Sequence, residues 1–307
     1  MTKSQPALQR RKPGGVLAVR ARTAVWFLVP ALLIIVLVAG YPLFKTISYS
    51  FTNASLVDPS IAENIGIGNY WYKTDDGQIG GILVDPKWWQ SVGNTVLFAV
   101  ASVFLEFVFG LGIAYVLNMK FPGQSLMRTA MLVPWAIPTV VSAQMWYFMY
   151  NDTFGLIGQG MGAGAVLADS SKVIWAIIAV DVWKTTPFMA LLLLAGMQGI
   201  SADIYEAANV DGASKWTQFW RITLPLLKPT AMIALIFRTL DALRVFDVMA
   251  VMLGTNKAAE TSMTAFARRS MIDYQNLGEG SGVSVLIFLI ILAITILYVT
   301  TLRVRFD

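Results

Sequence analysis

Residues 283–302 read VSVLIFLIILAITILYVTTL, a run that contains no charged side chain. Because an α-helix rises about 1.5 Å per residue, about 20 apolar residues cross a hydrocarbon core of about 30 Å. Five further runs have similar length and apolar character, at residues 26–44, 94–118, 129–150, 173–198 and 230–253. All are much longer than the roughly ten alternating residues of a barrel strand. The sequence therefore predicts an all-α integral membrane protein with about six transmembrane helices.

The composition supports a membrane location. Of the 307 residues, 56% are hydrophobic and 13% are charged, whereas about a quarter of the residues of a soluble domain are charged. The absence of Cys and His excludes disulfides, zinc sites and Cys or His catalytic groups. We expect no metal site and no cofactor bound by this chain. The net charge of +5 could suggest nucleic acid, but the basic residues lie in short segments between apolar runs, so we expect no nucleic-acid partner.

The distribution of Lys and Arg predicts the orientation. With the N-terminus in the cytoplasm, the inner segments hold 13 basic residues in 71 positions and the outer segments hold 7 in 100. Both termini are therefore expected in the cytoplasm. The first apolar run could also be a signal peptide. It is longer than a typical h-region, and no clear small-residue cleavage site follows it, so we interpret it as an uncleaved first span.

This topology divides the chain into two regions. Residues 1–24 are predicted to form a basic cytoplasmic tail, and residues 25–305 a transmembrane domain. The domain includes an outer segment at 45–93, rich in Tyr and Trp, and a cytoplasmic loop at 200–228. Aromatic side chains at a membrane edge are usually interface anchors. Contact with an external partner is the alternative for the outer segment.

The cytoplasmic loop contains the sequence EAANVDGA at 206–213. Its alanines favour a short helix, which Gly212 can end in a left-handed conformation. Ser214 can cap a second short helix, and Pro225 and Pro229 are expected to break regular helix at the entry into the fifth span. A helix with a face of small residues fits closely into a groove, such as one on a cytosolic partner. An interfacial helix without a partner is the alternative, and the physical argument does not separate the two.

Seven ionisable side chains fall inside the predicted spans, where a charge costs roughly 3 kcal/mol or more unless it faces the bundle interior or a wet cavity. They are Glu106, Asp181, Lys184, Arg238, Asp241, Arg244 and Asp247. At about 1.5 Å per residue, the two charges of the fourth span and the first two of the fifth lie near the midplane. Arg244 and Asp247 lie nearer the outer surface.

The midplane charges share faces with other candidate site residues at helical spacing. The faces carry Asp181, Lys184, Thr185 and Phe188 in the fourth span and Arg238, Asp241, Ala242 and Val245 in the fifth. Together with Trp183, they offer donors and acceptors for hydroxyl groups and apolar faces for C–H surfaces, as a sugar requires. The alternative is that the charges pair as structural ties, Asp181 with Lys184 and Arg238 with Asp241. Glu106 is expected to be a helix tie of this kind.

The order and spacing of the loop residues match a known pattern: Glu-Ala-Ala, three residues, Gly, nine residues, then Ile-x-Leu-Pro ending at Pro225. This pattern resembles the signature loop of importer-type ABC permeases. The resemblance implies that the loop is a coupling helix that docks into a cleft of a separate ATPase subunit. The residues implied at that contact are Glu206, Ala207, Ala208, Asp211, Gly212 and Ala213. The chain contains no G-x-x-x-x-G-K-[ST] sequence, so ATP and magnesium are expected on the ATPase partner.

Other segments are similar to the sugar-importing branch of that family, of the maltose/trehalose type. They are LVPWAIP at 132–138 with Trp146 and Gly155, VWKTTPF at 182–188, and Phe246-Asp247. The resemblance implies the ABC importer permease fold and a disaccharide substrate such as trehalose or maltose. It also places substrate contacts at Asp181, Lys184, Thr185 and Phe188, and near Arg238, Ala242 and Val245.

The resemblance further implies the partners: a second homologous permease subunit, two ATPase subunits, an external sugar-binding protein, and the lipid of a bacterial or archaeal cytoplasmic membrane. The alternative function is an ion-coupled secondary transporter of a small polar solute, with the buried carboxylates coupled to protons or cations. The lack of an evident internal repeat and the docking pattern argue against it. An enzyme is not expected, because the sequence has no paired catalytic carboxylates and no His ligands.

Overall fold

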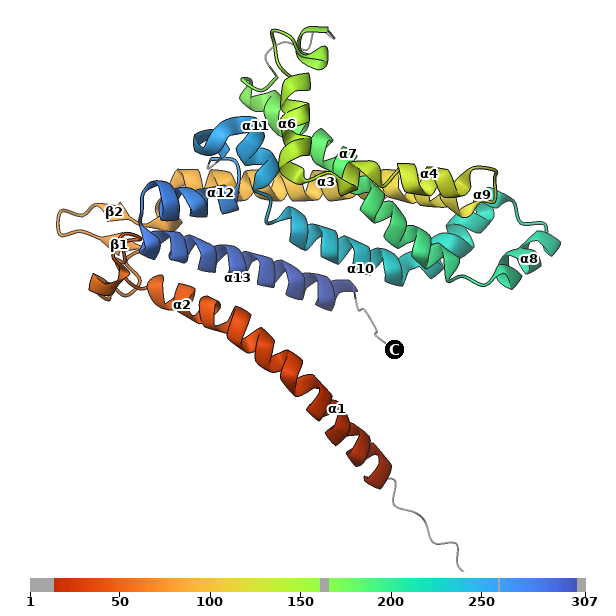
Figure 1. The fold of residues 1–307 in the computed structure, drawn as a ribbon, viewed down its shortest axis with the longest axis horizontal. Coiled ribbons are helices and arrows are strands. Elements are labelled where there is room, and N and C mark those ends of the chain that lie inside the picture. Colours follow the sequence, from red (N-terminus) through yellow and green to blue (C-terminus); the bar gives the residue numbers. More distant parts are fainter. Residues whose placement is uncertain (1–13, 161–165, 259, 303–307) are drawn as a thin grey trace, which may run out of the picture. The chain divides into compact units, whose positions relative to one another are not determined.

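The computed structural model describes residues 14–160, 166–258 and 260–302 (Figure 1). The chain divides into two units, Met1–Ser48 and Tyr49–Asp307. Among the described residues, five helices are long and apolar enough to cross a membrane, and one sharply bent pair of helices can form a sixth crossing. The prediction of about six transmembrane helices is therefore confirmed.

The first unit is a long helix. α1 (Gly14–Ile35) continues through a π-helical turn (Val36–Gly40) into α2 (Tyr41–Tyr49). Its large apolar side chains are exposed, Phe27 by 81%. An apolar surface of this kind indicates contact with lipid or with another protein. Residues 1–13 of the predicted cytoplasmic tail lie outside the described residues.

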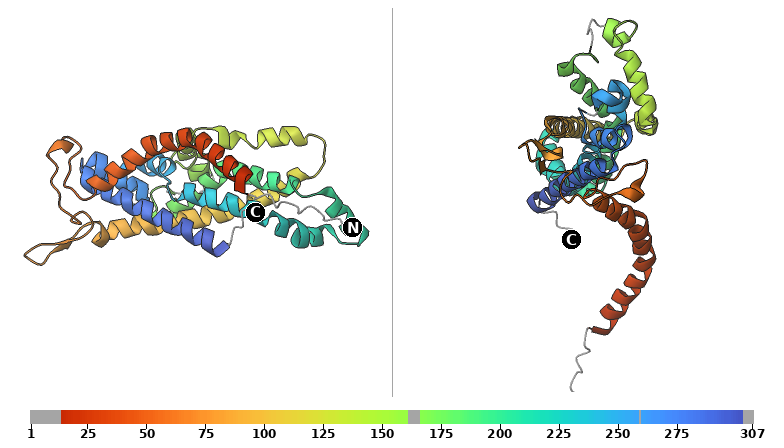
Figure 2. Two further views of the ribbon diagram at one scale, coloured as in Figure 1. Left: turned by 90° about the horizontal axis from the view of Figure 1, so that it is seen from below. Right: turned by 90° about the vertical axis from the view of Figure 1, so that its left-hand side faces the viewer.

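The core of the second unit is built on four long helices. They are α3 (Pro86–Asn118), α7 (Ser170–Gln198), α10 (Leu224–Ala242) and α13 (Leu277–Leu302). α3 packs extensively against α7, and α10 contacts α3, α7 and α13 (Figures 1 and 2). Small residues permit this close approach. Gly110 of α3 lies directly against Met189 of α7, and Gly196 of α7 lies against Leu227 of α10.

The third predicted span is a broken helix. Its parts are α4 (Gln124–Ala130), α5 (Val133–Ala136) and α6 (Thr139–Met149). The direction changes by 87° between α5 and α6. Ile137 is extended, with ψ of 132°, because the residue before a proline is disfavoured in the helical region. Pro138 also has no N–H to continue the helix. The span predicted at 129–150 is therefore present as a bent pair of helices and not as one continuous helix.

The fifth span is displaced toward the N-terminus relative to its predicted position at 230–253. The candidate span covers Lys215–Ala242, so Arg244 and Asp247 lie beyond its end, in contrast to the prediction, and are exposed. The segments around it are α8 (Ala202–Val210), α9 (Lys215–Gln218), a π-helical turn (Phe219–Thr223) and α11 (Asp247–Ala258).

The prolines at the start of α10 do not interrupt it, which corrects a second expectation about this span. Pro225 lies in the first turn of α10 and Pro229 lies inside the helix. A proline in a first turn removes an N–H that needs no helical partner. The irregular geometry lies instead in the π-helical turn before α10.

The remaining elements are short. They are 3₁₀ turns at Pro59–Ile61 and Ile82–Val84, β1 (Tyr72–Lys73), β2 (Ile79–Gly80), a π-helical turn at Leu156–Gly160, α12 (Met263–Arg268) and a π-helical turn at Arg269–Asp273. β1 and β2 pair antiparallel, with Tyr72 opposite Gly80. This small hairpin is a local departure from the expected all-α fold.

The start of α3 is tied to the connection between α11 and α12. Lys87 Nζ lies 2.7 Å from Glu260 Oε1, and this hydrogen bond lowers the pKa of the Glu260 carboxyl below its ordinary value. Thr95 Oγ1 accepts a hydrogen bond of 3.0 Å from the N–H of Met263. The end of α3 nearest the β-hairpin is therefore anchored to the C-terminal half of the chain.

The contact between α3 and α7 gives a direct test of the fold. Gly110→Val should lower the free energy of unfolding by about 1–3 kcal/mol, because the added side chain overlaps Met189. Gly112→Val, in the same helix, meets no atom within 4 Å of its Cβ and should change stability much less. Unfolding in mixed detergent micelles measures both. Equal losses in the two variants would contradict the described packing.

Candidate functional site

A buried ion pair joins α3 to α10. Arg238 Nε donates to Glu106 Oε2 at 2.6 Å, and Arg238 Nη2 donates to Glu106 Oε1 at 2.9 Å. The two side chains are 3% and 0% exposed. Two parallel bonds between a guanidinium and a carboxylate are the strongest form of this pairing and fix the plane of the guanidinium. Glu106 is thus the helix tie expected from the sequence, with Arg238 as its partner.

The same guanidinium holds two further carboxylates. Arg238 Nη2 also pairs with Asp181 of α7, and Arg238 Nη1 pairs with Asp241 at 3.1 Å. Thr185 Oγ1 accepts from Nη2 at 3.3 Å while it donates to the C=O of Asp181 at 2.6 Å. Arg238 therefore ties α3, α7 and α10 together. Of the two alternative pairings considered above, Arg238 with Asp241 is present, whereas Asp181 pairs with Arg238 instead of Lys184.

The exposed part of this network is a carboxylate. Asp241 has a side chain that is 69% exposed, whereas Glu106 and Arg238 are buried and Asp181 is 13% exposed. Three carboxylates surround one guanidinium, so the donors of Arg238 are already engaged. Lys184 follows Asp181 by three residues in α7 and supplies a second cation on the same side of that helix. The accessible polar groups are therefore Asp241 and Lys184.

An aromatic pair lies next to Lys184. The rings of Trp135 and Phe188 are stacked, with centroids 5.9 Å apart and planes 11° from parallel. Lys184 Nζ donates to the C=O of Trp135 at 3.5 Å. Trp135 is 47% exposed and lies in α5, just before the break at Pro138. Sequence reasoning placed Trp135 in a family motif but missed it as a site residue. The signal available was its position beside the proline that breaks the span.

The other predicted site residues lie elsewhere in the bundle. Trp183 meets Trp146 edge to face, with centroids 5.5 Å apart. Ala242 is buried in the apolar core, and Val245, beyond the end of α10, packs against the same core. The structure thus brings Asp181, Thr185, Arg238 and Asp241 into one network. It places Lys184 and Phe188 at the aromatic stack, and Ala242 and Val245 in the apolar core.

The predicted coupling loop is a well-defined helix–turn–helix. α8 ends at a Schellman motif, in which the N–H of Ala213 bonds to the C=O of Ala208 at 2.9 Å. Gly212 has a φ of +74°, the left-handed conformation that favours glycine at this position. Ser214 caps α9 by accepting from the N–H of Thr217 at 3.2 Å. Both sequence-based expectations for the loop, the glycine turn and the serine cap, are confirmed.

The loop presents small and acidic residues on its surface. Glu206, Ala207 and Asp211 are exposed, whereas Ala208 is buried. Gln218 of α9 donates to Asn209 Oδ1 at 2.8 Å and to the C=O of Ala213 at 2.9 Å. These bonds lock α8 onto α9, which continues through the π-helical turn into α10. These contacts connect α8 to the helix that carries Arg238.

Comparison with known proteins decides the family. Residues 106–306 match the family described as binding-protein-dependent transport system inner membrane component. The chain belongs to this family. Its members are the membrane-spanning subunits of ABC importers, so this permease is a translocation subunit and not an enzyme. Membership also favours an importer driven by a separate ATPase over the ion-coupled alternative.

Several relatives resemble the permease over most of their length. It is 45% identical to the trehalose/maltose transport system permease protein MalF of Thermococcus litoralis, over 74% of this chain and 78% of that protein. It is 35% identical to the trehalose transport system permease protein SugA of Mycobacterium tuberculosis, over 91% and 88%. The sulfoquinovosyl glycerol transport system permease protein SmoG of Agrobacterium fabrum is 34% identical, over 92% and 91%.

Solved structures support the fold. The permease matches a chain in the crystal structure of a bacterial ABC transporter that imports the acidic polysaccharide alginate, with a TM-score of 0.73 and 18% identity. The match covers 94% of the permease and 98% of that chain. The ABC importer permease fold predicted from the sequence is thereby confirmed.

The tie between α3 and α10 is expected to dominate stability within this site. Glu106→Ala should cost about 3–5 kcal/mol of unfolding free energy, because Arg238 keeps its charge in a buried position without its bidentate partner. Asp241→Ala removes an exposed partner of the same guanidinium and should cost about 1 kcal/mol or less. Denaturation in mixed micelles compares the two variants. Similar losses of unfolding free energy in the two variants would show that the buried Glu106 pair does not stabilise the bundle more than the exposed Asp241 pair.

Proposed function

We propose that the permease is the membrane-spanning subunit of an ATP-driven importer of a sugar, a disaccharide such as trehalose or maltose. The observation that carries this proposal is the Arg238 network beside the Trp135–Phe188 stack, within a chain whose relatives are named for trehalose and maltose transport. Charged groups form strong hydrogen bonds with hydroxyls, and flat aromatic faces suit the C–H surface of a sugar ring.

The substrate site consists of groups with two roles. Asp241, Lys184 and Thr185 contact sugar hydroxyls, while Phe188 and Trp135 contact the ring faces. The buried groups position them: Arg238, Asp181 and Glu106 hold Asp241 and Thr185 in place through the bonds described above. Trp183, Ala242 and Val245 support these groups from the bundle, where Ala242 and Val245 belong to the apolar core and Trp183 packs against Trp146.

The permease works with partner subunits. It pairs with a second homologous permease, and two ATPase subunits bind ATP and magnesium and dock at the coupling loop, formed by Glu206, Ala207, Ala208, Asp211, Gly212 and Ala213. An external sugar-binding protein delivers the substrate. A solved relative of the same fold was determined with an alginate-bound periplasmic protein. Both termini and the coupling loop face the cytoplasm, and the membrane is the cytoplasmic membrane of a bacterium or archaeon.

The mechanism is alternating access. Closure of the ATPase pair displaces α8, and the continuous path through α9 carries this movement into α10. Since Arg238 ties α10 to α3 and α7, these three helices move as one body. The break at Pro138 allows α6 to take a different direction from α5. Movement of the tied helices against the broken span opens the Trp135–Phe188 stack first to one side of the membrane and then to the other.

The aromatic stack provides the test of the sugar site. Phe188→Ala and Trp135→Ala should raise the sugar concentration for half-maximal uptake about five-fold or more, since an aromatic contact of this kind is worth about 1 kcal/mol. Neither variant removes a charge, so assembly and basal ATP hydrolysis should persist. Trehalose and maltose uptake into proteoliposomes measures the effect.

Phe237→Ala is the matched control for these two variants. Phe237 is the neighbour of Arg238 in α10 and is 62% exposed, so its removal should leave sugar affinity unchanged. Unaltered affinity in the two stack variants would place the sugar site elsewhere in the bundle.

The coupling loop provides an independent test. Gly212→Pro should abolish sugar-stimulated ATP hydrolysis, because proline holds φ near −65° and the loop requires +74°. Glu206→Lys should weaken ATPase binding by reversing an exposed charge. Co-purification of the ATPase and hydrolysis rates measure both effects.

The control for the charge reversal is Asp75→Lys, which reverses an exposed carboxylate in the turn of the β-hairpin. It should leave ATPase binding intact.

A Cys introduced at Ser214 should react only with reagents that reach the cytoplasm. Labelling from outside would reject the orientation together with the docking role.

A further inference from the structure

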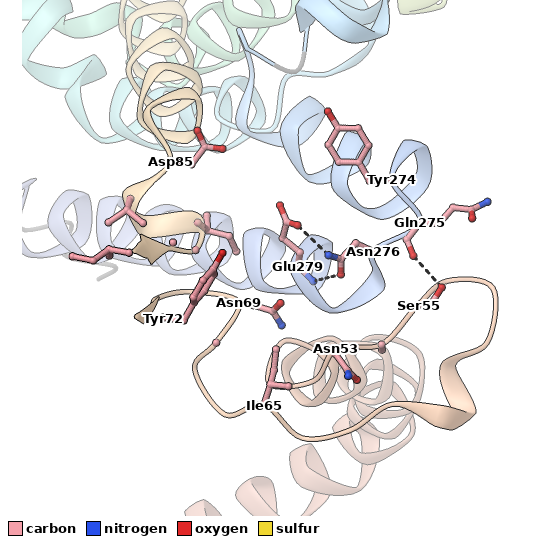
Figure 3. Close-up of a pocket in the computed structure, with 17 residues that line it drawn as sticks. Asn53, Ser55, Ile65, Asn69, Tyr72, Asp85, Tyr274, Gln275, Asn276 and Glu279 are labelled. Carbon is pink, nitrogen blue, oxygen red and sulfur yellow. Dashed lines mark hydrogen bonds between the residues drawn. The ribbon is translucent and has the colours of Figure 1, made fainter. Parts of the chain in front are cut away.

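A polar cleft lies far from the Arg238 network. It has a volume of about 840 Å³ and is formed by the segment 53–85 and the turn that begins α13 (Figure 3). From Asp85, at the start of α3, to Glu106 the helix extends for 21 residues, or about 30 Å at 1.5 Å per residue. In the proposed orientation, the cleft is at the outer surface, where substrate arrives.

The walls of the cleft are joined by backbone hydrogen bonds. The N–H of Leu56 donates to the C=O of Gln275 at 2.8 Å, and the N–H of Gly278 donates to the C=O of Ala54 at 2.9 Å. Gln275 has a φ of +55°, which is uncommon for a residue other than glycine. Such backbone strain persists only where the surroundings enforce it, and it is often found at functional sites. The cleft is therefore preformed.

Its polar groups suit a ligand rich in hydroxyl donors. Glu279 is held in position by Ser270, which donates to Oε1, and by Asn276, which donates to Oε2, both at 3.1 Å. Asp85 Oδ1 caps α3 through the N–H of Lys87 at 2.8 Å, and its other oxygen makes no hydrogen bond with the described residues. The described residues that line the cleft include no Lys or Arg. An anionic ligand is therefore disfavoured and a neutral polyol is favoured.

Two tyrosines add exposed ring surface to these acceptors. Tyr72 and Tyr274 are 48% and 64% exposed, and both line the cleft (Figure 3). The ring of Tyr72 lies over Gly80 of the paired strand, where a Cβ would overlap it. The glycine thus leaves room for the ring at the edge of the cleft. Carboxylates and amides next to tyrosine rings form the type of surface that binds sugar hydroxyls and C–H faces together.

We propose that this cleft is a second carbohydrate site, which binds a neutral sugar at the outer surface of the permease before its passage through the bundle. Its role in import rests on the proposed function, whereas sugar binding at the cleft does not. The volume accommodates a disaccharide, since pockets for small ligands are about 300–1,000 Å³. The cleft is separate from the aromatic stack, so the two sites can be occupied independently.

Photo-affinity labelling tests the proposal at the level of individual peptides. The probe is a diazirine derivative of trehalose, applied to the full-length permease with its partner subunits in lipid nanodiscs. Labelled peptides from 53–85 and 274–279 are expected, and excess trehalose should suppress them, whereas excess glucuronate should not. Tyr72→Ala should reduce this labelling about five-fold, and Gln275→Gly, which removes an amide from the lining residues, should reduce it to a smaller extent.

The variants are chosen so that folding is preserved. Gln275→Gly keeps the left-handed backbone, which glycine adopts readily, and removes only the side chain. Trp71→Ala, next to Tyr72 but outside the cleft lining, is the matched control and should label normally. Labelling of α7 peptides reports the Arg238 region separately, so loss of that signal alone bears on the proposed function and not on the cleft.

Two results would overturn the second site. One is the absence of trehalose-protected labelling at 53–85 and 274–279 while α7 peptides are labelled. The other is equal labelling of the wild type, Tyr72→Ala and Gln275→Gly. If the cleft variants label normally but weaken stimulation by the external binding protein, the cleft is a protein contact and the carbohydrate proposal is wrong.

Discussion

The pairing of Arg238 with Glu106 is the constraint on which the rest of the bundle depends. A charge in a hydrocarbon environment is tolerated only when a partner and hydrogen bonds replace water. Arg238 satisfies this requirement by binding Glu106 through two bonds and by holding Asp181 and Asp241 as well. Three helices from distant parts of the chain must therefore meet at one guanidinium. The glycines that bring α3, α7 and α10 close together serve the same geometry.

This constraint separates a rigid part of the permease from parts that can move. α3, α7 and α10 share the buried ion network, and α8 and α9 are locked to one another and continue into α10. The segment α4–α6 makes no ion pair with these helices within the described residues and is broken at Pro138. The aromatic stack joins these two parts, because Trp135 belongs to the broken span and Phe188 to α7. In the proposed mechanism, a sugar bound at the stack contacts both bodies at the place where they move relative to each other.

The network also shapes the polarity that a substrate meets. Arg238 is saturated by carboxylates, so the permease presents Asp241 and Lys184 instead of a bare guanidinium. The outer cleft has acceptors and aromatic rings but no cation among its described lining residues. Both surfaces suit neutral, hydroxyl-rich molecules. The exposed side chains of α1 and α2 are apolar, unlike those of these two polar surfaces, and suit contact with lipid or a partner subunit.

The sequence by itself determined the membrane class, the approximate number of spans, the turn and cap of the loop at 200–228, and the helical faces that carry charge. These follow from local properties: the length of apolar runs, the spacing of residues on a helix, and the preference of Gly212 and Ser214 for turn and cap. Only the tertiary structure decided that Glu106 is the partner of Arg238, since 132 residues separate them and no local pattern encodes that contact. It also decided that the third span bends at Pro138, that the fifth ends at Ala242, and that Ala242 and Val245 lie in the apolar core. In each case the outcome depends on which helices lie side by side, and periodicity along one helix does not contain that information.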